Sequence, residues 1–261
     1  MFNKFFANVL AVIFFSFLIM PWFANADEIK PLTLKYSNYY PEVSAVVQNI
    51  HKPVLESIVK GTEGKVQFKE YWAGSLHSLP DGFNAARSGL TDLTQAYVFT
   101  QQGSFNLPHC DSLPFAFSNS VVGSIVMEEL YPKYFKKEYE KMGVNCAFYP
   151  VLEYTGIISR TPIRTLEDLK GKQLYVPGGM LQTVYKALGA TPVLIAPAEC
   201  FQALQRGILD GLVYPAGLIV PQRYHEIAKH FTNIPMVYGA IPFALNKKAF
   251  KTMPEELQKD F

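Results

Sequence analysis

Four tyrosines, Tyr39, Tyr97, Tyr175 and Tyr214, occur where the sequence predicts that β-strands end. A tyrosine hydroxyl can donate and accept hydrogen bonds, and its ring has a flat face that can lie against apolar groups or a cation. Any one of them alone is equally expected in an apolar core. As a set they occupy the positions where open α/β sheets place ligands. We therefore expect the four side chains to converge on one cleft that binds a small molecule.

The residue types that carry catalysis or bind metals are present, but not in useful patterns. His225 and His230 lie five residues apart, whereas two metal ligands on one helix face are three or four apart. Cys110, Cys146 and Cys200 form no Cys-x-x-Cys pair, which favours three free thiols. There is also no nucleophile elbow, phosphate-binding loop or dinucleotide fingerprint. We expect no catalytic residue, no metal site and no cofactor.

The stretch TLEDLKGKQLYVPGG, residues 165–179, shows how one of the tyrosines is positioned. Thr165 can cap a short helix with Asp168 as its reciprocal partner, and the next glycine is the expected left-handed stop. A strand over 173–176 follows and ends abruptly at Pro-Gly-Gly. Tyr175 therefore stands at a strand end that opens on a crevice.

Strands that alternate with helical stretches predict an α/β protein with mainly parallel strand pairing. The alternation begins again near residue 156, and a long strand over 237–245 can return to the first set of elements. We predict two lobes with a ligand cleft between them. The first comprises residues 27–152 together with 239–261, and the second comprises residues 153–238.

Periodicity within this pattern predicts the individual elements. Alternating residues predict strands over 93–99 and 146–154. A helical rhythm over 43–58 is interrupted by Pro53, where we expect a kink. Residues 221–229 are predicted to be helical.

Residues 1–26 have the features of a secretory signal. A lysine near the start precedes an apolar run over 9–20, and Ala24-Asn25-Ala26 provides the small residues that signal peptidase requires. The apolar run is shorter than a membrane span. We expect cleavage after Ala26 and a periplasmic product; the alternative is a single N-terminal membrane helix.

The charges are almost balanced, with 24 Lys and Arg against 22 Asp and Glu. Nucleic-acid-binding domains carry a clear excess of cationic side chains. The composition therefore argues against nucleic acid as a partner.

Several motifs follow one another in order over nearly all of the chain after residue 26. They are Gly64-Lys-Val, Trp72-Ala-Gly-Ser-Leu, Ser88-Gly-Leu-Thr-Asp92, Leu113-Pro-Phe-Ala-Phe, Pro162-Ile-Arg-Thr-Leu-Glu-Asp-Leu-Lys-Gly171, Leu188-Gly-Ala-Thr-Pro-Val, Glu199-Cys-Phe-Gln-Ala-Leu-Gln-Arg-Gly and Leu209-Asp-Gly211. In this order they resemble the extracytoplasmic solute receptors of TRAP transporters, also called C4-dicarboxylate-binding or family 7 solute-binding proteins. The resemblance implies a secreted, non-enzymatic receptor with a two-lobed periplasmic-binding-protein fold, which delivers a small organic solute to a TRAP permease.

The family normally continues into a long helix that spans both lobes. In this sequence a helix begins at Pro254 and ends within its second turn, and so short a helix has no stability of its own. We therefore expect the sequence to be a C-terminally truncated fragment.

The resemblance also assigns roles to the tyrosines. The position of Tyr175 usually holds an arginine that clamps the substrate carboxylate, and the position of Tyr214 usually holds an asparagine. Further pocket positions of the family fall near Tyr39, Tyr97 and Thr155. None of these positions carries a charge in this sequence.

The nearest candidate charge is Glu153, since Arg160 and Arg164 are expected on or beyond the lobe surface. This pocket suits an aromatic solute or an organic cation held against ring faces. A small organic acid held by hydroxyls and backbone amides, which is the habit of the family, stays open. So do two other functions, namely a sensor or interaction module for a membrane signalling partner and, with less support, an enzyme on the same fold.

Overall fold

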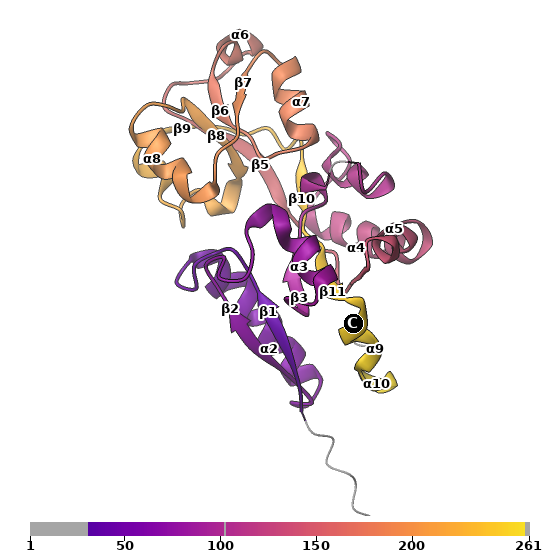
Figure 1. Ribbon diagram of the computed structural model, residues 1–261. Coiled ribbons are helices and arrows are strands. Elements are labelled where there is room, and N and C mark those ends of the chain that lie inside the picture. The colour runs from indigo at the N-terminus through magenta and orange to yellow at the C-terminus, as the bar shows by residue number, and fades with distance from the viewer. Residues whose placement is uncertain (1–30, 102, 259–261) are drawn as a thin grey trace, which may run out of the picture. The chain divides into compact units, whose positions relative to one another are not determined.

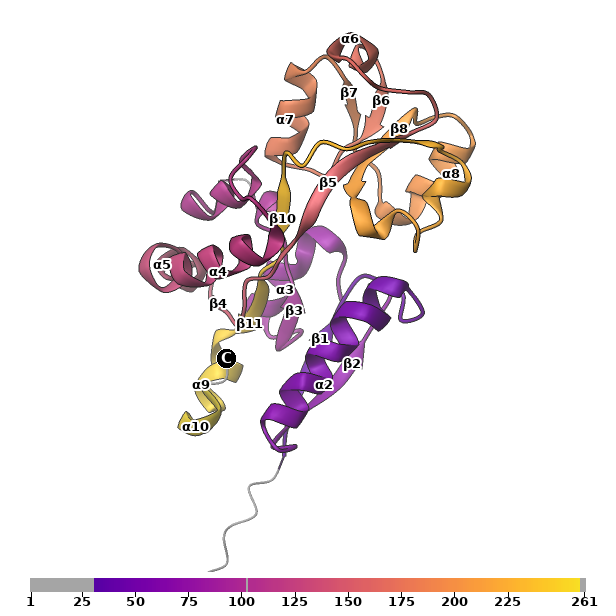
Figure 2. The same ribbon diagram turned by 180° about the vertical axis from the view of Figure 1, so that it is seen from behind.

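The computed structural model describes residues 31–101 and 103–258, and the elements below belong to one compact unit, Leu32–Phe261. The strands form two sheets, with the orders β2-β1-β3-β11-β4 and β10-β5-β8-β6-β7, and β9 pairs with β5. Helices pack against both sheets (Figures 1 and 2). The predicted α/β class is confirmed, whereas the predicted signal, residues 1–26, lies outside the described residues.

The first sheet combines parallel and antiparallel pairing. Its strands are β1 (Leu32–Ser37), β2 (Val66–Tyr71), β3 (Leu93–Gln95), β4 (Val144–Cys146) and β11 (Phe243–Asn246). β1 pairs in parallel with β2 and β3, and β11 runs antiparallel to β3 and β4. The helical elements around it are η1 (Val47–His51), α2 (Lys52–Gly61), η2 (Leu79–Asp81), α3 (Gly82–Ser88), η3 (Val98–Thr100), η4 (Leu107–Ser112), α4 (Ser120–Leu130), η5 (Tyr131–Phe135), α5 (Lys136–Lys141), α9 (Lys247–Thr252) and α10 (Glu255–Gln258).

The second sheet is also mixed. Its strands are β5 (Val151–Ser159), β6 (Gln173–Tyr175), β7 (Thr191–Val193), β8 (Gly211–Pro215), β9 (His230–Thr232) and β10 (Tyr238–Ala240). β6 lies parallel to β7 and β8, whereas β5 runs antiparallel to β8, β9 and β10. The prediction of mainly parallel pairing is therefore wrong, because β5 and β11 run antiparallel to all of their neighbours. Its helical elements are α6 (Leu166–Leu169), α7 (Met180–Ala187), η6 (Pro197–Glu199), α8 (Cys200–Gln205), η7 (Ala216–Leu218) and η8 (Tyr224–Glu226).

Two connections join the sheets. The chain leaves β4 in the first sheet and enters β5 in the second, and it returns from β10 to β11. The predicted return of the chain over 237–245 is therefore confirmed, but it consists of two strands, β10 and β11. Ile241-Pro242 separates them, because proline has no N–H to donate to a neighbouring strand. The strand predicted over 146–154 is likewise two, since β4 ends at Cys146 and β5 begins at Val151.

The proline in the first long helix changes its winding. Pro53 lacks an N–H and cannot bond the carbonyl four residues before it. The turn just ahead of it, η1, is wound as a π-helix, in which the N–H of Lys52 reaches back to the carbonyl of Val47. The kink expected at Pro53 takes the form of this wider turn.

Two predicted elements are shorter than expected. The strand predicted over 93–99 ends at Gln95, and Tyr97 instead caps the turn η3. The helix predicted over 221–229 is reduced to the single turn η8, which starts after Arg223 in a left-handed conformation with φ of 61°. Local periodicity fails at both places because the chain leaves the sheet there to form loops.

The helix predicted after Thr165 is confirmed with its cap. The Thr165 hydroxyl accepts the backbone N–H of Asp168, and the Asp168 carboxylate accepts the backbone N–H of Thr165. These backbone hydrogen bonds lower the pKa of Asp168. Within the described ranges, no helix is both long and apolar enough to cross a membrane.

The core beneath the first sheet contains a buried hydroxyl without a described partner. Tyr139 is fully buried among aromatic rings, and no described group hydrogen-bonds its hydroxyl. A buried hydroxyl without a hydrogen bond does not recover the free energy that its removal from water costs. We expect Tyr139→Phe to leave the free energy of unfolding unchanged or to raise it by up to about 1 kcal/mol, as measured by urea denaturation.

The matched control is Tyr149→Phe. Tyr149 is equally buried, but its hydroxyl donates to the carboxylate of Asp111 at 3.4 Å. Its removal leaves that carboxylate with less hydrogen bonding and is expected to cost about 1 kcal/mol. Equal losses in the two variants would show that the Tyr139 hydroxyl has a partner after all.

Candidate functional site

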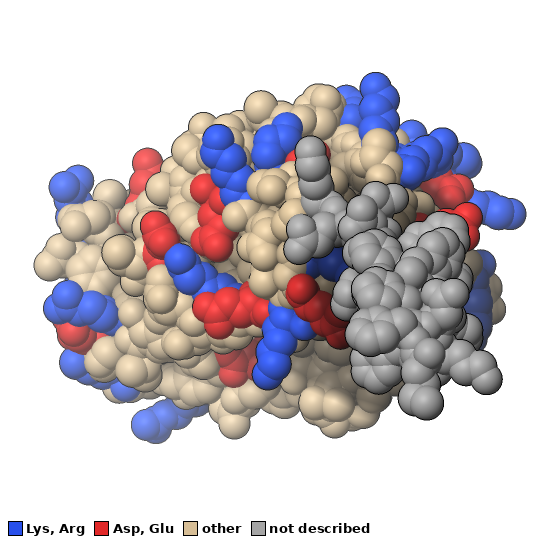
Figure 3. All heavy atoms as spheres, turned by 90° about the horizontal axis from the view of Figure 1, so that it is seen from below, with Lys and Arg blue, Asp and Glu red and all other residues tan. Residues whose placement is uncertain are grey.

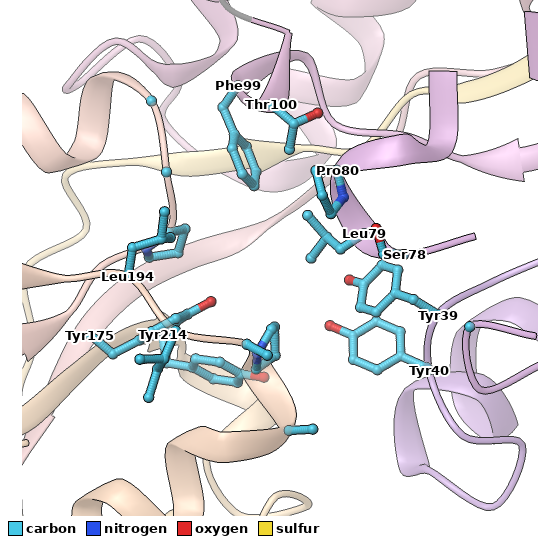
Figure 4. A pocket seen from close by; sticks show the side chains of 18 of the residues that line it. Tyr39, Tyr40, Ser78, Leu79, Pro80, Phe99, Thr100, Tyr175, Leu194 and Tyr214 are labelled. Atoms are coloured by element: carbon cyan, nitrogen blue, oxygen red, sulfur yellow. The ribbon is translucent and has the colours of Figure 1, made fainter. Parts of the chain in front are cut away.

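A cavity of about 840 Å³ lies between the two sheets (Figure 4). It is bounded by the segments that follow the carboxyl ends of β1, β2 and β3 on one side and of β6, β7 and β8 on the other. From the first sheet it is lined by residues 39–41, 44, 74, 78–80, 99 and 100. From the second it is lined by residues 175, 177–179, 182, 194–198, 214 and 222. This is the crevice in which parallel sheets bind ligands.

Three of the predicted tyrosines line this cavity together with a fourth, Tyr40. Tyr39 and Tyr40 follow β1, and their hydroxyls point into the cavity in Figure 4. Tyr175 ends β6 and Tyr214 lies near the end of β8, with their ring centroids 6.3 Å apart. Burial raises the pKa of each of these hydroxyls above its usual value, so all four keep their protons at physiological pH.

Tyr97 stands behind Tyr39 rather than on the cavity wall. Its hydroxyl lies 2.7 Å from the hydroxyl of Tyr39 and accepts a hydrogen bond from the Gln95 amide at 2.7 Å. Its ring packs at 5.0 Å from that of Phe99, which does line the cavity. Tyr97 can therefore act on a ligand through Tyr39.

The other two predicted residues lie on β5, away from the lining. Thr155 is buried, and its backbone N–H donates to the carbonyl of Val237 at 2.9 Å. The carboxylate of Glu153 lies against Gly217 in the turn after β8. The structure does not bring Glu153 or Thr155 to the cavity with the tyrosines, and their part in binding stays a prediction.

The cavity wall is uncharged. No Asp, Glu, Lys, Arg or His occurs among the described residues that line it. Arg160 and Arg164 are exposed, as the sequence predicted. The lining combines hydroxyls with apolar side chains such as Leu79, Phe99 and Leu194.

Two glycines let the sheets approach each other at one side of the cavity. Gly179 precedes α7 with φ of 73°, a conformation that favours glycine. A side-chain carbon at Gly179 would lie 2.8 Å from the Cβ of Phe99, which is closer than such atoms approach. Gly178 also faces that ring. The Pro-Gly-Gly turn after β6 thus ends the strand and leaves room for the side chain of Phe99, which lies in η3.

Several lining residues had no clear signal in the sequence. Leu79 and Pro80 lie in η2, and Leu194 begins the loop after β7. They are ordinary loop residues by composition. Only their positions after parallel strands indicated a role, and strand ends are hard to place from periodicity alone.

The described residues contain no group of three His, Cys, Asp or Glu side chains that could hold a metal ion. All three cysteines are free thiols, Cys146 and Cys200 being buried and Cys110 half-buried. His230 lies in β9 and not on a helix with His225. Burial lowers the pKa of His51 to about 4, so this histidine is neutral.

Comparison with known proteins gives a consistent result. The family model for the bacterial extracellular solute-binding protein, family 7 (DctP), matches residues 36–261. A solute-binding protein of Sulfitobacter sp. (strain NAS-14.1) is 29% identical over 157 residues, which are 56% of this chain and 45% of that relative. The chain thus spans less than half the length of this relative.

Two solved structures share the fold. A TRAP solute-binding protein of Rhodoferax ferrireducens T118, in complex with copurified benzoate, is 24% identical with a TM-score of 0.80. A TRAP periplasmic solute-binding protein of Bordetella bronchiseptica, with bound (R)- and (S)-mandelate, is 28% identical with a TM-score of 0.78. Each alignment covers 88% of this chain and 73% of the other. The two-lobed periplasmic-binding-protein fold predicted from the sequence is confirmed.

Proposed function

Because the chain belongs to the bacterial extracellular solute-binding proteins of family 7, we propose that it captures a small organic solute and delivers it to a TRAP-type membrane permease. The observation that carries the proposal is the cavity of about 840 Å³ at the strand ends of both sheets. A cavity of that size suits a small organic molecule. The mandelate complex of the Bordetella relative is consistent with a solute that contains an aromatic ring.

The connections between the sheets suit a receptor that closes on its ligand. We place the lobes at residues 27–152 with 239–261 and at residues 153–238. These boundaries fall within β5 and β10, the strands by which the chain leaves and re-enters the first sheet, so bending of these two strands would let the tyrosines of both sides meet a solute. Binding would then stabilise the closed state, which the permease recognises.

We place this activity in the periplasm. The family is extracellular, and residues 1–26 have the pattern of a cleaved signal. Lys and Arg are interspersed with Asp and Glu on the face in Figure 3, which is typical of a solvated surface. Mass spectrometry of the exported protein is expected to find an N-terminus at Asp27, and an intact Met1 on exported protein would contradict cleavage.

A receptor accounts for the cavity better than an enzyme does. Among its described lining residues, the only side chains with polar atoms are hydroxyls and amides. Burial raises the pKa of the tyrosine hydroxyls, which keeps them from acting as bases near neutral pH. We therefore propose binding without chemical conversion.

Binding is tested by a thermal-shift screen of the purified protein against carboxylates, amines, aromatic acids and uncharged aromatics. A solute present at 100 times its Kd stabilises the folded state by about 2.7 kcal/mol. For a chain of this size we expect Tm to rise by roughly 5–10 °C. A screen in which no solute of any class raises Tm would contradict the receptor proposal.

Two alanine replacements separate binding in the cavity from binding elsewhere. Ala198 is exposed and lines the cavity, whereas Ala116 is exposed and lies outside it. Ala198→Trp is expected to fill part of the cavity and abolish the shift, and Ala116→Trp to leave it unchanged. Delivery is tested with the permease in vesicles, where uptake of the screened solute should require the receptor and an ion gradient.

A further inference from the structure

The cavity has a defined hydrogen-bonding polarity as well as an uncharged wall. We propose that its solute is an uncharged molecule with a flat apolar or aromatic body and a hydrogen-bond acceptor, such as a carbonyl oxygen, that binds the hydroxyl proton of Tyr39. Asn38, Gln95 and Tyr97 are positioning residues that direct this proton into the cavity. The proposal rests on the proposed function and specifies the class of solute for that same site.

The lining of the cavity bears on the charge of the solute. No described lining residue is ionisable near neutral pH, and the tyrosines keep their protons. A charged solute would leave water without gaining a counter-charge from these described residues, which is costly in a closed cleft. The N-terminus of α7, after Gly179, carries about half an elementary charge. That partial charge favours an acceptor oxygen but does not neutralise a carboxylate.

The orientation of the Asn38 amide is fixed by the backbone of Tyr40. The backbone N–H of Tyr40 can only donate, and it lies 2.9 Å from Oδ1 of Asn38. Asn38 is 1% exposed, so water does not compete for its amide. Its carbonyl oxygen therefore accepts from Tyr40, and its Nδ2 must donate elsewhere.

The orientation of Asn38 in turn orients Gln95 on the neighbouring strand. β1 and β3 pair in parallel with Ser37 opposite Thr94, so Asn38 lies beside Gln95. Asn38 Nδ2 donates to Oε1 of Gln95 at 3.0 Å. Gln95, which is 2% exposed, must then present its Nε2, and this nitrogen donates to the Tyr97 hydroxyl at 2.7 Å.

The hydroxyls of Tyr97 and Tyr39 continue this chain of hydrogen bonds. Because the oxygen of Tyr97 already accepts from Gln95, we assign its own proton to the oxygen of Tyr39, 2.7 Å away. In this assignment Tyr39 accepts from Tyr97, and its own proton is left for the cavity side, where Figure 4 shows its hydroxyl oxygen beside that of Tyr40. A solute that accepts a hydrogen bond completes this chain, and a solute that only donates does not.

A second hydroxyl, that of Tyr175, faces the cavity from the side of the second sheet. Tyr175 is 5% exposed, and no group in residues 31–101 or 103–258 hydrogen-bonds its hydroxyl. The opposite walls are formed by Leu79, Phe99 and Leu194, which Figure 4 shows around the same space. Figure 4 shows Tyr175 beside Leu194 on one side of the cavity and Tyr39 near Leu79 on the other. Each side thus combines an apolar wall with a hydroxyl, which matches a flat ring that carries a carbonyl group.

Four probes of one size and shape test the charge and polarity of the cavity. They are acetophenone, ethylbenzene, benzoate and benzylammonium, which differ in having a neutral acceptor, no polar group, a negative charge or a positive charge. We expect calorimetric titration at pH 7.5 to show acetophenone binding about tenfold more tightly than ethylbenzene. Against the two ions the preference should reach about a hundredfold.

Two variants test the direction of the hydrogen bonds. Tyr39→Phe removes the donor and is expected to weaken acetophenone about tenfold without weakening ethylbenzene. Gln95→Glu replaces the donating nitrogen by an oxygen, which turns Tyr97 and then Tyr39 toward the protein. Its acetophenone affinity should fall as pH rises from 5 to 9 and the new carboxyl ionises, while the wild type stays constant. Tyr134→Phe, at a 57% exposed tyrosine, is the control.

The possible results are distinct. Tighter binding of benzoate or benzylammonium than of acetophenone would overturn the inference and leave the receptor function intact. The same holds if the thermal-shift screen identifies a charged solute. An equal loss of acetophenone and ethylbenzene in Tyr39→Phe would also overturn it, because it would show a loss of shape and not of a donor. This readout holds even if Gln95→Glu does not fold. If no solute of any class binds, the receptor function fails and the inference fails with it.

Discussion

Tyr175→Arg is expected to reverse the charge preference of the cavity. Tyr175 is 5% exposed and packs among apolar side chains and Tyr214, so a guanidinium at this position would be a buried cation without a counter-charge. The cost is on the order of 3 kcal/mol or more, which corresponds to a loss of about a hundredfold in affinity for an uncharged solute. The same guanidinium offers a carboxylate a planar fork with two parallel donors. Benzoate should therefore gain affinity where acetophenone loses it, as measured by calorimetric titration.

Two further replacements at the same position separate charge from shape. Tyr175→Phe keeps the ring and removes only the hydroxyl, so it should reduce affinity for the uncharged solute by no more than about tenfold. Tyr175→Lys supplies a cation without the planar fork and should improve benzoate less than arginine does. If the natural solute proves to be a carboxylate and Tyr175→Arg binds it more tightly, the uncharged cavity is the wrong description.

The stability of the protein is expected to fall between about pH 4 and pH 7 because of Asp111. This carboxyl is 3% exposed beneath the first sheet, and burial raises its pKa from the ordinary 3.8 to about 7. The folded state therefore keeps the proton in a range where the unfolded state has released it, and the free energy of unfolding decreases as pH rises. Across the window this amounts to on the order of 4 kcal/mol.

Asp111→Asn tests this expectation because an amide cannot ionise. The hydroxyls of Ser112 and Tyr149 surround the group at 2.7 Å and 3.4 Å and can bond an amide as well. Urea denaturation from pH 4 to pH 8 should show a falling free energy of unfolding in the wild type and a flatter profile in the variant. Glu129→Gln, at an exposed carboxyl on α4, should retain the wild-type slope. A wild-type profile without this slope would show that Asp111 stays ionised in the fold.

Features that depend on neighbours along the chain could be predicted from the sequence. The cap at Thr165 needs only the residue three positions on, and the strand over 66–71 follows from alternation. Gly89 and Gly171 adopt the left-handed conformation in which glycine ends a helix. The sequence also shows that position 175 carries no charged residue, because this depends on the identity of one residue alone.

The tertiary structure decided which of these residues meet. Tyr97 retreats behind Tyr39 because β3 ends at Gln95, so the alternation of a strand no longer directs its side chain. Glu153 and Thr155 do not line the cavity because both lie within β5, which continues to Ser159. Their neighbours there are Gly217 and Val237. A one-residue difference in where a strand ends moves a side chain to another face, and periodicity does not define strand ends that closely.

By itself the sequence determined the α/β class, the family motifs and the uncharged tyrosines at strand ends. Only the tertiary structure brought together the residues from which we infer the hydrogen-bond direction at Tyr39. That direction depends on Asn38 and Gln95, which lie 57 residues apart and meet through the register of two strands. Register is fixed by the packing of the whole sheet, because it aligns every buried side chain of both strands at once. No local pattern around either residue contains that information.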